Sequence, residues 1–307
     1  MIDRLIEKIE NCNNPTVVGL DPTYEMMPKA IKEEMLETYG KTPKAVANMF
    51  FRFNTEIIDQ ISDLVPAVKP QIAMYEKYGL EGLKSYMDTI AYAKEKGLII
   101  IGDIKRGDIA STASAYAAHI EGVTIEGTRF DLWNEDAVTL NPYMGFDGIE
   151  PFIAPCNDYD KGLFILVKTS NPSGKEIQDL QVEGKPIYAH TAGLVSKWGE
   201  LAMGAGKYSK IGAVVGATYK EQGAELRRMM PHTFFLVPGY GAQGATGSDL
   251  TGYFDKDGQG CIINSSRGII AAYKKDQKYG EQHFAEAARE AALHMKKDLE
   301  GALCQRK

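Results

Sequence analysis

Cysteine, tryptophan and long apolar runs are scarce in this sequence of 307 residues. No stretch reaches the roughly 18 consecutive apolar residues of a membrane span. The N-terminal segment places charges between apolar residues at helical spacing, so we expect no signal peptide and a soluble, cytoplasmic protein. The scattered cysteines form no Cys-x-x-Cys pair, which argues against a zinc site and a disulfide framework. They are Cys12, Cys156, Cys261 and Cys304.

Positive charge is also in deficit, with 35 Lys and Arg against 41 Asp and Glu and a net charge of −6. A protein that binds a nucleic acid backbone is usually basic, so nucleic acid is not expected as a partner. The five histidines are dispersed and show no His-Glu-x-x-His motif, so we expect no metal site and no histidine chemistry. The 44% hydrophobic and 25% charged residues are typical of an ordinary globular protein.

Eight short apolar runs rich in Val, Ile and Leu alternate with amphipathic stretches of helical period. Continuous apolar strands separated by helices indicate a parallel sheet that is buried on both faces. Eight such units favour an α/β fold of the (β/α)₈ TIM barrel type, although a doubly wound open sheet would show the same local pattern. The runs are residues 16–20, 65–68, 98–101, 137–140, 163–167, 211–215, 233–237 and 261–263.

Between the runs, the pattern predicts helices over 54–64, 81–96 and 282–299. Segments 22–53 and 170–210 are longer than one loop and one helix require, so we expect extra helices in the loops there. No internal repeat or low-complexity linker divides the chain. Residues 1–307 are therefore predicted to form a single barrel domain.

Polar residues follow these runs, and in a barrel the carboxyl ends of the strands carry the active site. Asp103, Lys105 and Asp108 follow the third run, and in extended geometry the first two share one face. Asp21 and Lys69 end the first two runs at the same level. An ammonium group among carboxylates stays protonated, which suits Lys105 to donate a proton to carbon. The alternative is a solvated salt-bridge turn at a strand end.

Glycine-rich turns follow the last two runs, where barrels often bind phosphate through backbone N–H groups and a cation. The first turn, Pro-Gly-Tyr-Gly-Ala-Gln-Gly over 238–244, contains Gln243, and the second contains Arg267 and Gly268. We therefore expect a substrate that carries phosphate. The first turn also fits the Gly-x-Gly-x-x-Gly fingerprint, but too few residues follow it for a complete dinucleotide-binding half.

Several of these motifs together resemble one enzyme family. The spacing Asp103-x-Lys105-x-x-Asp108-Ile109 is combined with the two phosphate turns, with Gly-Leu-Asp-Pro at 19–22 and with Thr-Ser-Asn-Pro at 169–172. In this combination the chain resembles the orotidine 5′-phosphate decarboxylase family, in its longer bacterial branch. The resemblance spans most of the chain.

The resemblance implies decarboxylation of orotidine 5′-phosphate to uridine 5′-phosphate in pyrimidine nucleotide synthesis, with no cofactor and no metal. Lys105 would protonate C6 of the pyrimidine, and Asp103 would lie against the substrate carboxylate. Lys69 would bridge the acidic groups and a ribose hydroxyl. The binding residues would be Asp21 for the ribose, Thr169 or Ser170 for the pyrimidine edge, and Pro238, Gln243, Arg267 and Gly268 for the phosphate.

The resemblance also implies a homodimer, because in the family the second aspartate and a threonine four residues on belong to the neighbouring subunit's site. These are Asp108 and Thr112 in this sequence. The glycine-rich segment 240–253 is predicted to be a mobile lid over the phosphate.

Two rival functions fit the same barrel. A sugar-phosphate lyase or aldolase would usually need Mg²⁺ held by carboxylates. A catalytically silent barrel that binds nucleotides would have no need of Lys105.

Overall fold

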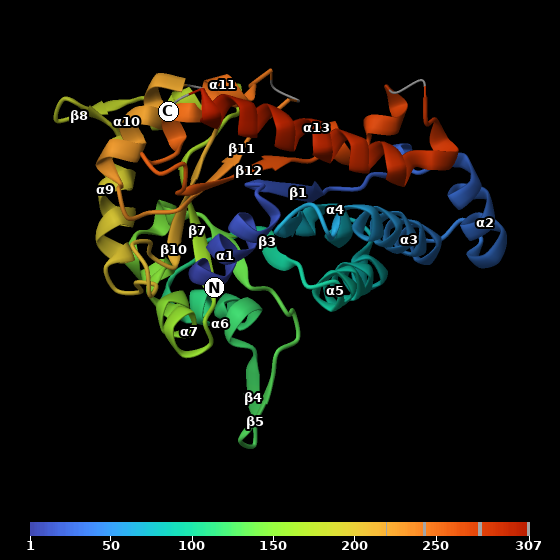
Figure 1. The fold of residues 1–307 in the computed structure, drawn as a ribbon. Helices are drawn as coiled ribbons and strands as arrows, with labels where there is room; N and C mark the ends of the chain where they lie inside the picture. The colour runs from blue at the N-terminus through green and yellow to red at the C-terminus, as the bar shows by residue number, and fades with distance from the viewer. Residues whose placement is uncertain (219, 242–243, 276–277, 306–307) are drawn as a thin grey trace.

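The computed structural model describes residues 1–218, 220–241, 244–275 and 278–305, and eight parallel strands close a barrel at its centre (Figure 1). Strand β1 pairs with both β2 and β12, and this pairing closes the cylinder. The predicted (β/α)₈ barrel is therefore confirmed, and the open sheet is wrong. Around the cylinder the strands are β1 (Thr16–Leu20), β12 (Cys261–Ser265), β11 (Phe235–Pro238), β10 (Ile211–Val215), β7 (Gly162–Lys168), β6 (Ala137–Leu140), β3 (Ile99–Arg106) and β2 (Ala67–Pro70).

All eight apolar runs correspond to barrel strands, with small shifts at their ends. The run at 65–68 was placed two residues too early, since β2 spans Ala67–Pro70. The larger correction concerns β3, which continues to Arg106, so that Asp103 and Lys105 lie within the strand rather than after it. Polar side chains at a barrel mouth mask the end of a strand in a pattern based on apolar residues.

Helices surround the barrel, and the longest of them were predicted in part. The helix expected over 54–64 begins at Pro43, where the hydroxyl of Thr42 caps it by accepting a hydrogen bond from the Ala45 N–H at 3.2 Å. The helices are α1 (Ile2–Cys12), α2 (Lys29–Tyr39), α3 (Pro43–Ile61), α4 (Ile72–Glu76), α5 (Gly79–Glu95), α6 (Ala110–Glu121), α7 (Ile153–Asp158), α8 (Lys175–Gln178), α9 (Ile187–Gly199), α10 (Lys220–Met229), α11 (Gly247–Leu250), α12 (Arg267–Ile270) and α13 (Phe284–Cys304).

The two long insertions contain the expected extra elements. Helix α2 and the beginning of α3 occupy 22–53, while α8, a small hairpin and α9 occupy 170–210. Two short hairpins were not predicted: β4 (Val123–Ile125) with β5 (Thr128–Phe130), and β8 (Gln181–Val182) with β9 (Lys185–Pro186). The β4–β5 hairpin projects away from the barrel (Figure 1).

The amino end of the barrel is closed by helix α1. Met1, Ile2 and Leu5 are buried and pack against the side chains that fill the barrel interior, among them Phe164. The second and larger core lies between the strands and the surrounding helices. With one end closed by apolar packing, the carboxyl ends of the strands form the polar mouth.

Candidate active site

The carboxylate of Asp103 is the centre of a cluster of charged and polar groups at the carboxyl ends of β2, β3 and β6. Its Oδ2 accepts a hydrogen bond from the ammonium of Lys69 at 2.8 Å, and its Oδ1 accepts one from Lys105 at 2.5 Å. Asp21, after β1, lies 3.9 Å from the Lys69 nitrogen. Four of the predicted site residues are thus brought together by three adjacent strands.

Two further residues bind Asp103 and were missed in the sequence. The amide of Gln71 donates to Oδ2 at 3.0 Å, and the hydroxyl of Thr139 donates to Oδ1 at 2.9 Å. Gln71 lies two residues beyond Lys69, and Thr139 lies inside the apolar run that became β6. The alternation of side chains along a strand could have indicated Gln71, whereas Thr139 needed the pairing of β3 with β6.

The position of Lys105 depends on an irregular strand. The register between β3 and β6 shifts between Gly102 and Arg106, and Lys105 has φ +46°, in the left-handed region that non-glycine residues rarely adopt. Thr139 accepts the Lys105 N–H at 2.9 Å and so holds this backbone conformation. Ile104, which lies between Asp103 and Lys105, packs into the outer core. Regular alternation alone therefore does not explain why Lys105 meets Asp103.

Burial and charge shift the pKa values of this cluster in opposite directions. Burial disfavours the charged form of Lys69, but the charges of Asp103 and Asp21 outweigh it, and the pKa of Lys69 is raised. Burial likewise disfavours the Asp103 carboxylate, but Lys69 and Lys105 hold the pKa of Asp103 well below its usual range. Both groups are therefore charged at neutral pH.

Three other predicted site residues make few contacts with the Asp103 cluster: Asp21, Asp108 and Thr112. The Oδ1 atom of Asp21 is buried and has no hydrogen-bond partner among the described residues. Asp108 caps its neighbour, since its Oδ1 accepts the Ile109 N–H at 2.7 Å, and Thr112 is exposed in the first turn of α6. Among the described side chains, no hydrogen bond or ion pair joins Asp108 to Lys105 of the same chain.

The end of β7 is held by the insertion that follows it. The Thr169 hydroxyl donates to Asn171 Oδ1 at 2.6 Å and accepts from the Gln178 amide at 2.7 Å. Gln178 also accepts the Thr169 N–H at 2.9 Å. Ser170 is the next residue and is half-buried. The buried ammonium of Lys168 pairs with Asp179 and so stabilises the insertion rather than the mouth.

The predicted phosphate residues lie at the ends of neighbouring strands β11 and β12. Pro238 ends β11, and its carbonyl accepts the Ala217 N–H at 2.9 Å. Arg267 and Gly268 begin the short helix α12, and both are exposed. Gln243 lies outside the described residues, and so does part of the predicted lid at 240–253. Within that segment, Tyr253 is fully buried, and its hydroxyl donates to the Gly216 carbonyl at 2.7 Å.

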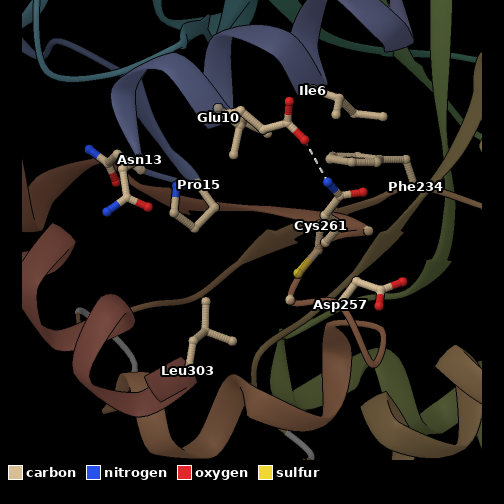
Figure 2. A pocket seen from close by; sticks show the side chains of 13 residues that line it. Ile6, Glu10, Asn13, Pro15, Phe234, Asp257, Cys261 and Leu303 are labelled. Carbon is tan, nitrogen blue, oxygen red and sulfur yellow. Dashed lines mark hydrogen bonds between the residues drawn. The ribbon is translucent and has the colours of Figure 1, made fainter. Parts of the chain in front are cut away.

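A cavity of about 200 Å³ lies at the opposite, amino end of the barrel (Figure 2). Ile6, Phe234 and Leu303 are among its apolar walls, and a hydrogen bond of 2.6 Å from the Gln259 amide to Glu10 crosses its rim. None of the predicted site residues lines it. Among the described residues, no three His, Cys, Asp or Glu side chains are arranged to hold a metal ion, and no helix is long and apolar enough to span a membrane.

The fold and the mouth together define a class: a (β/α)₈ barrel in which two lysines share one buried aspartate at the ends of adjacent strands. Residues 15–281 match the sequence model of the orotidine 5′-phosphate decarboxylase / HUMPS family. The chain therefore belongs to this family.

Individual relatives agree with this assignment over nearly the full length. An orotidine 5′-phosphate decarboxylase of Rhodopirellula baltica is 44% identical over 93% of this chain and 94% of its own. One from Petrotoga mobilis is 45% identical over 98% of both chains. The solved structure of Leishmania donovani OMP decarboxylase superposes with a TM-score of 0.75 at 28% identity, covering 99% of this chain and 98% of that one.

Proposed function

We propose that this protein decarboxylates orotidine 5′-phosphate to uridine 5′-phosphate, without a cofactor, in pyrimidine nucleotide synthesis. The observation that carries the proposal is the sharing of the buried Asp103 carboxylate by the ammonium groups of Lys69 and Lys105. Membership of the orotidine 5′-phosphate decarboxylase / HUMPS family supports the same substrate.

In the proposed step, the bond between C6 and the carboxylate breaks, carbon dioxide leaves, and the electron pair stays on C6. The ring cannot delocalise this pair, so a positive charge must already lie beside C6, where the negative charge develops. Lys105 supplies that charge and transfers a proton to C6. Its side chain is 44% exposed, so the neutral amine can regain a proton from water. Each 1.36 kcal/mol by which these charges stabilise the transition state would raise the rate about tenfold.

The other charged groups would prepare the site. Asp103 would face the substrate carboxylate. Lys69 would hold Asp103 ionised, and the Lys69 ammonium would also bind a ribose hydroxyl. The buried Oδ1 of Asp21 accepts no hydrogen bond from a described residue, so it is suited to accept one from the ribose. A ligand hydroxyl there would add a hydrogen bond to an atom whose nearest cation, the Lys69 ammonium, is 3.9 Å away.

Ser170 rather than Thr169 is the better candidate for the pyrimidine edge. The Thr169 hydroxyl already donates one hydrogen bond and accepts another, whereas Ser170 follows the point at which Gln178 fixes the chain. Pro238, Arg267 and Gly268, together with Gln243, would bind the phosphate. Ser170→Ala should weaken nucleotide binding more than Thr169→Val does, and equal effects would contradict this choice.

We further propose a homodimer in which Asp108 and Thr112 complete the partner's site. The surface at this mouth supports it, since Ile109, Tyr143 and Met144 are large apolar side chains that are 55%, 83% and 44% exposed. If residues are shared, Lys105→Ala and Asp108→Ala subunits should complement each other, because a mixed dimer places both defects in one site. Random mixing should restore about a quarter of wild-type activity. No recovery would contradict the shared site.

The experiment that tests the function is an ultraviolet assay of orotidine 5′-phosphate with excess EDTA. We expect full turnover with the chelator, because no step is assigned to a metal. Loss of activity that Mg²⁺ restores would favour a lyase or aldolase, and binding without turnover would favour a silent nucleotide-binding barrel.

Two properties of the whole chain complete the proposal. None of the four cysteines forms a disulfide bond in the described part of the chain, which is typical of a reducing compartment and supports a cytoplasmic location. Every barrel strand belongs to one closed sheet, which supports a single domain over residues 1–307. Cooperative unfolding in one transition, at the same denaturant concentration by fluorescence and circular dichroism, is the expected result.

A further inference from the structure

A buried carboxylate that the proposed reaction does not use lies behind the catalytic strand. Glu135 is fully buried, just before β6, and its Oε1 accepts a hydrogen bond from the Tyr86 hydroxyl of α5. Its Oε2 lies 2.8 Å from Nδ1 of His119 in α6, so the ring donates through Nδ1–H. The His119 ring stacks on Trp133, with centroids 4.3 Å apart. Two helices, α5 and α6, thus each supply a hydrogen-bond donor to one carboxylate.

This carboxylate packs directly against the backbone that precedes Asp103. A Cβ atom added to Gly102 would lie 2.2 Å from Glu135 Oε1 and 2.5 Å from its Cδ. Glycine at 102 therefore leaves the space that the carboxylate occupies. Moving the carboxylate away from Gly102 would disturb its hydrogen bonds to Tyr86 and His119.

Gly102 is also where the strand irregularity begins. The pairing of β3 with β6 shifts between Gly102 and Arg106, and within this interval Lys105 adopts its left-handed conformation. The Glu135 carboxylate thus supports the first residue of the segment that sets the 2.5 Å contact between Lys105 and Asp103. A buried carboxylate that accepts two hydrogen bonds is costly to displace, so it is a rigid support.

We propose that Glu135, fixed by Tyr86 and His119, is a positioning residue for the Asp103 and Lys105 pair. The inference rests on the proposed function. Its physical basis is that groups outside the reacting shell lock the geometry of those inside it. A displacement of about 1 Å at the reacting groups can cost about 100-fold in rate.

The same network reaches the helix that begins beside Asp108. His119 lies in the last turn of α6, whose first turn carries Thr112. Glu135 therefore links the strand with Lys105 to the helix proposed to serve the partner's site.

The test compares two variants of the network with a matched control. Glu135→Gln keeps the size of the side chain and removes its charge, and Gly102→Ala pushes against the carboxylate. The control is Asp136→Asn, because Asp136 is the next residue, is also buried, and accepts the Ile100 N–H at 2.9 Å at the beginning of the same strand. For each protein, kcat, KM, the Kd of uridine 5′-phosphate and the melting temperature are measured.

We expect kcat to fall about 10-fold in Glu135→Gln and about 100-fold in Gly102→Ala, with the Kd of uridine 5′-phosphate within about twofold of wild type. Asp136→Asn should lower the melting temperature while kcat stays within about threefold, measured below its melting range. A merely structural role for Glu135 would lower the melting temperature and leave kcat unchanged.

Wild-type kcat in Glu135→Gln, or an equal loss of kcat in Asp136→Asn, would overturn the inference while leaving the proposed function intact. Should Gly102→Ala fail to fold, Glu135→Gln still decides the question, because it adds no atoms. Absence of turnover by the wild-type protein would instead overturn the proposed function and this inference with it.

Discussion

The two ends of the barrel place their charges in different surroundings. At the carboxyl end, Lys69 and Asp103 are buried and each is held in its charged form by the other. At the amino end, Arg4 bridges Asp136 at 3.2 Å and Asp160 at 2.9 Å, and both Arg4 and Asp160 are about half exposed. One end gathers its charges inside the protein around Asp103, whereas at the other end the buried Asp136 carboxylate is paired with partly exposed cations at the edge of the barrel.

This difference indicates that the charges at the amino end contribute to stability, whereas those at the carboxyl end serve function. Ion pairs near water are worth little, generally below about 1 kcal/mol, and at the amino end they secure α1 over an apolar plug. Buried charges are costly unless they are paired and hydrogen-bonded, so a cluster in which Asp21 Oδ1 has a 3.9 Å contact with Lys69 but no hydrogen bond is not explained by stability. Buried charge with incomplete hydrogen bonding is therefore found at the carboxyl end, where it is expected to serve the reaction.

Among the variants that compare the two ends, the largest combined loss of activity and stability should come from removing a buried cation at the carboxyl end. Lys69→Met leaves Asp103 with one ammonium partner, so we expect turnover to fall at least about 100-fold and the free energy of unfolding to fall by about 3 kcal/mol. The matched variant at the amino end is Lys94→Met, which breaks a 3.0 Å pair with Asp136. Assays and denaturant titrations of both would contradict the comparison if Lys94→Met lost as much activity as Lys69→Met.

An intermediate effect should appear in acid. Because the folded-state pKa of Asp103 is lowered, its stabilising contribution is present above the unfolded value of about 4 and is lost as pH falls toward the folded value. Asp103→Asn should be less stable than wild type at pH 7, yet lose less stability between about pH 4 and pH 2. Free energies of unfolding measured across this range test the sign, and parallel curves for the two proteins would contradict it.

The smallest effect should come from the solvated amino end. Asp160→Asn weakens the contacts with Arg4, with the N-terminal ammonium group of Met1 and with Lys210. Because the Asp160 side chain is about half exposed, we expect the free energy of unfolding to fall by about 1 kcal/mol or less. Turnover should stay within about twofold of wild type, because this end is remote from the reacting groups. An activity loss on the scale of Lys69→Met would show that the two ends are not separate in function.

Much of the barrel could be predicted because its strands are continuous apolar runs. Strands β1, β6 and β10 match their predicted ranges fully, since all their residues are buried. Both missed hairpins turn on a Glu-Gly pair with positive φ at both residues: Glu126 and Gly127, then Glu183 and Gly184. Glu-Gly is not among the Asn-Gly, Asp-Gly and Gly-Gly pairs that signal such a turn, and the strands beside it are short and exposed, so they lacked the apolar pattern that revealed the barrel.

The clustering of Asp21, Lys69, Asp103 and Lys105 could be predicted because polar residues that end apolar runs meet at the mouth of a barrel. Contacts that form only across strands were missed. Thr139 and Glu135 act on β3 from β6 and from the segment before it, so their roles depend on strand order and register. The left-handed backbone of Lys105 also arises from packing and left no signal in the local sequence.

The most direct test of the proposed chemistry is single-turnover decarboxylation of orotidine 5′-phosphate by wild type and Lys105→Ala, with titration of uridine 5′-phosphate into both. We predict that the variant binds the product nucleotide but loses turnover by about 10⁴-fold or more, because the proton donor and its charge are both removed. Turnover by Lys105→Ala within about tenfold of wild type would contradict the account.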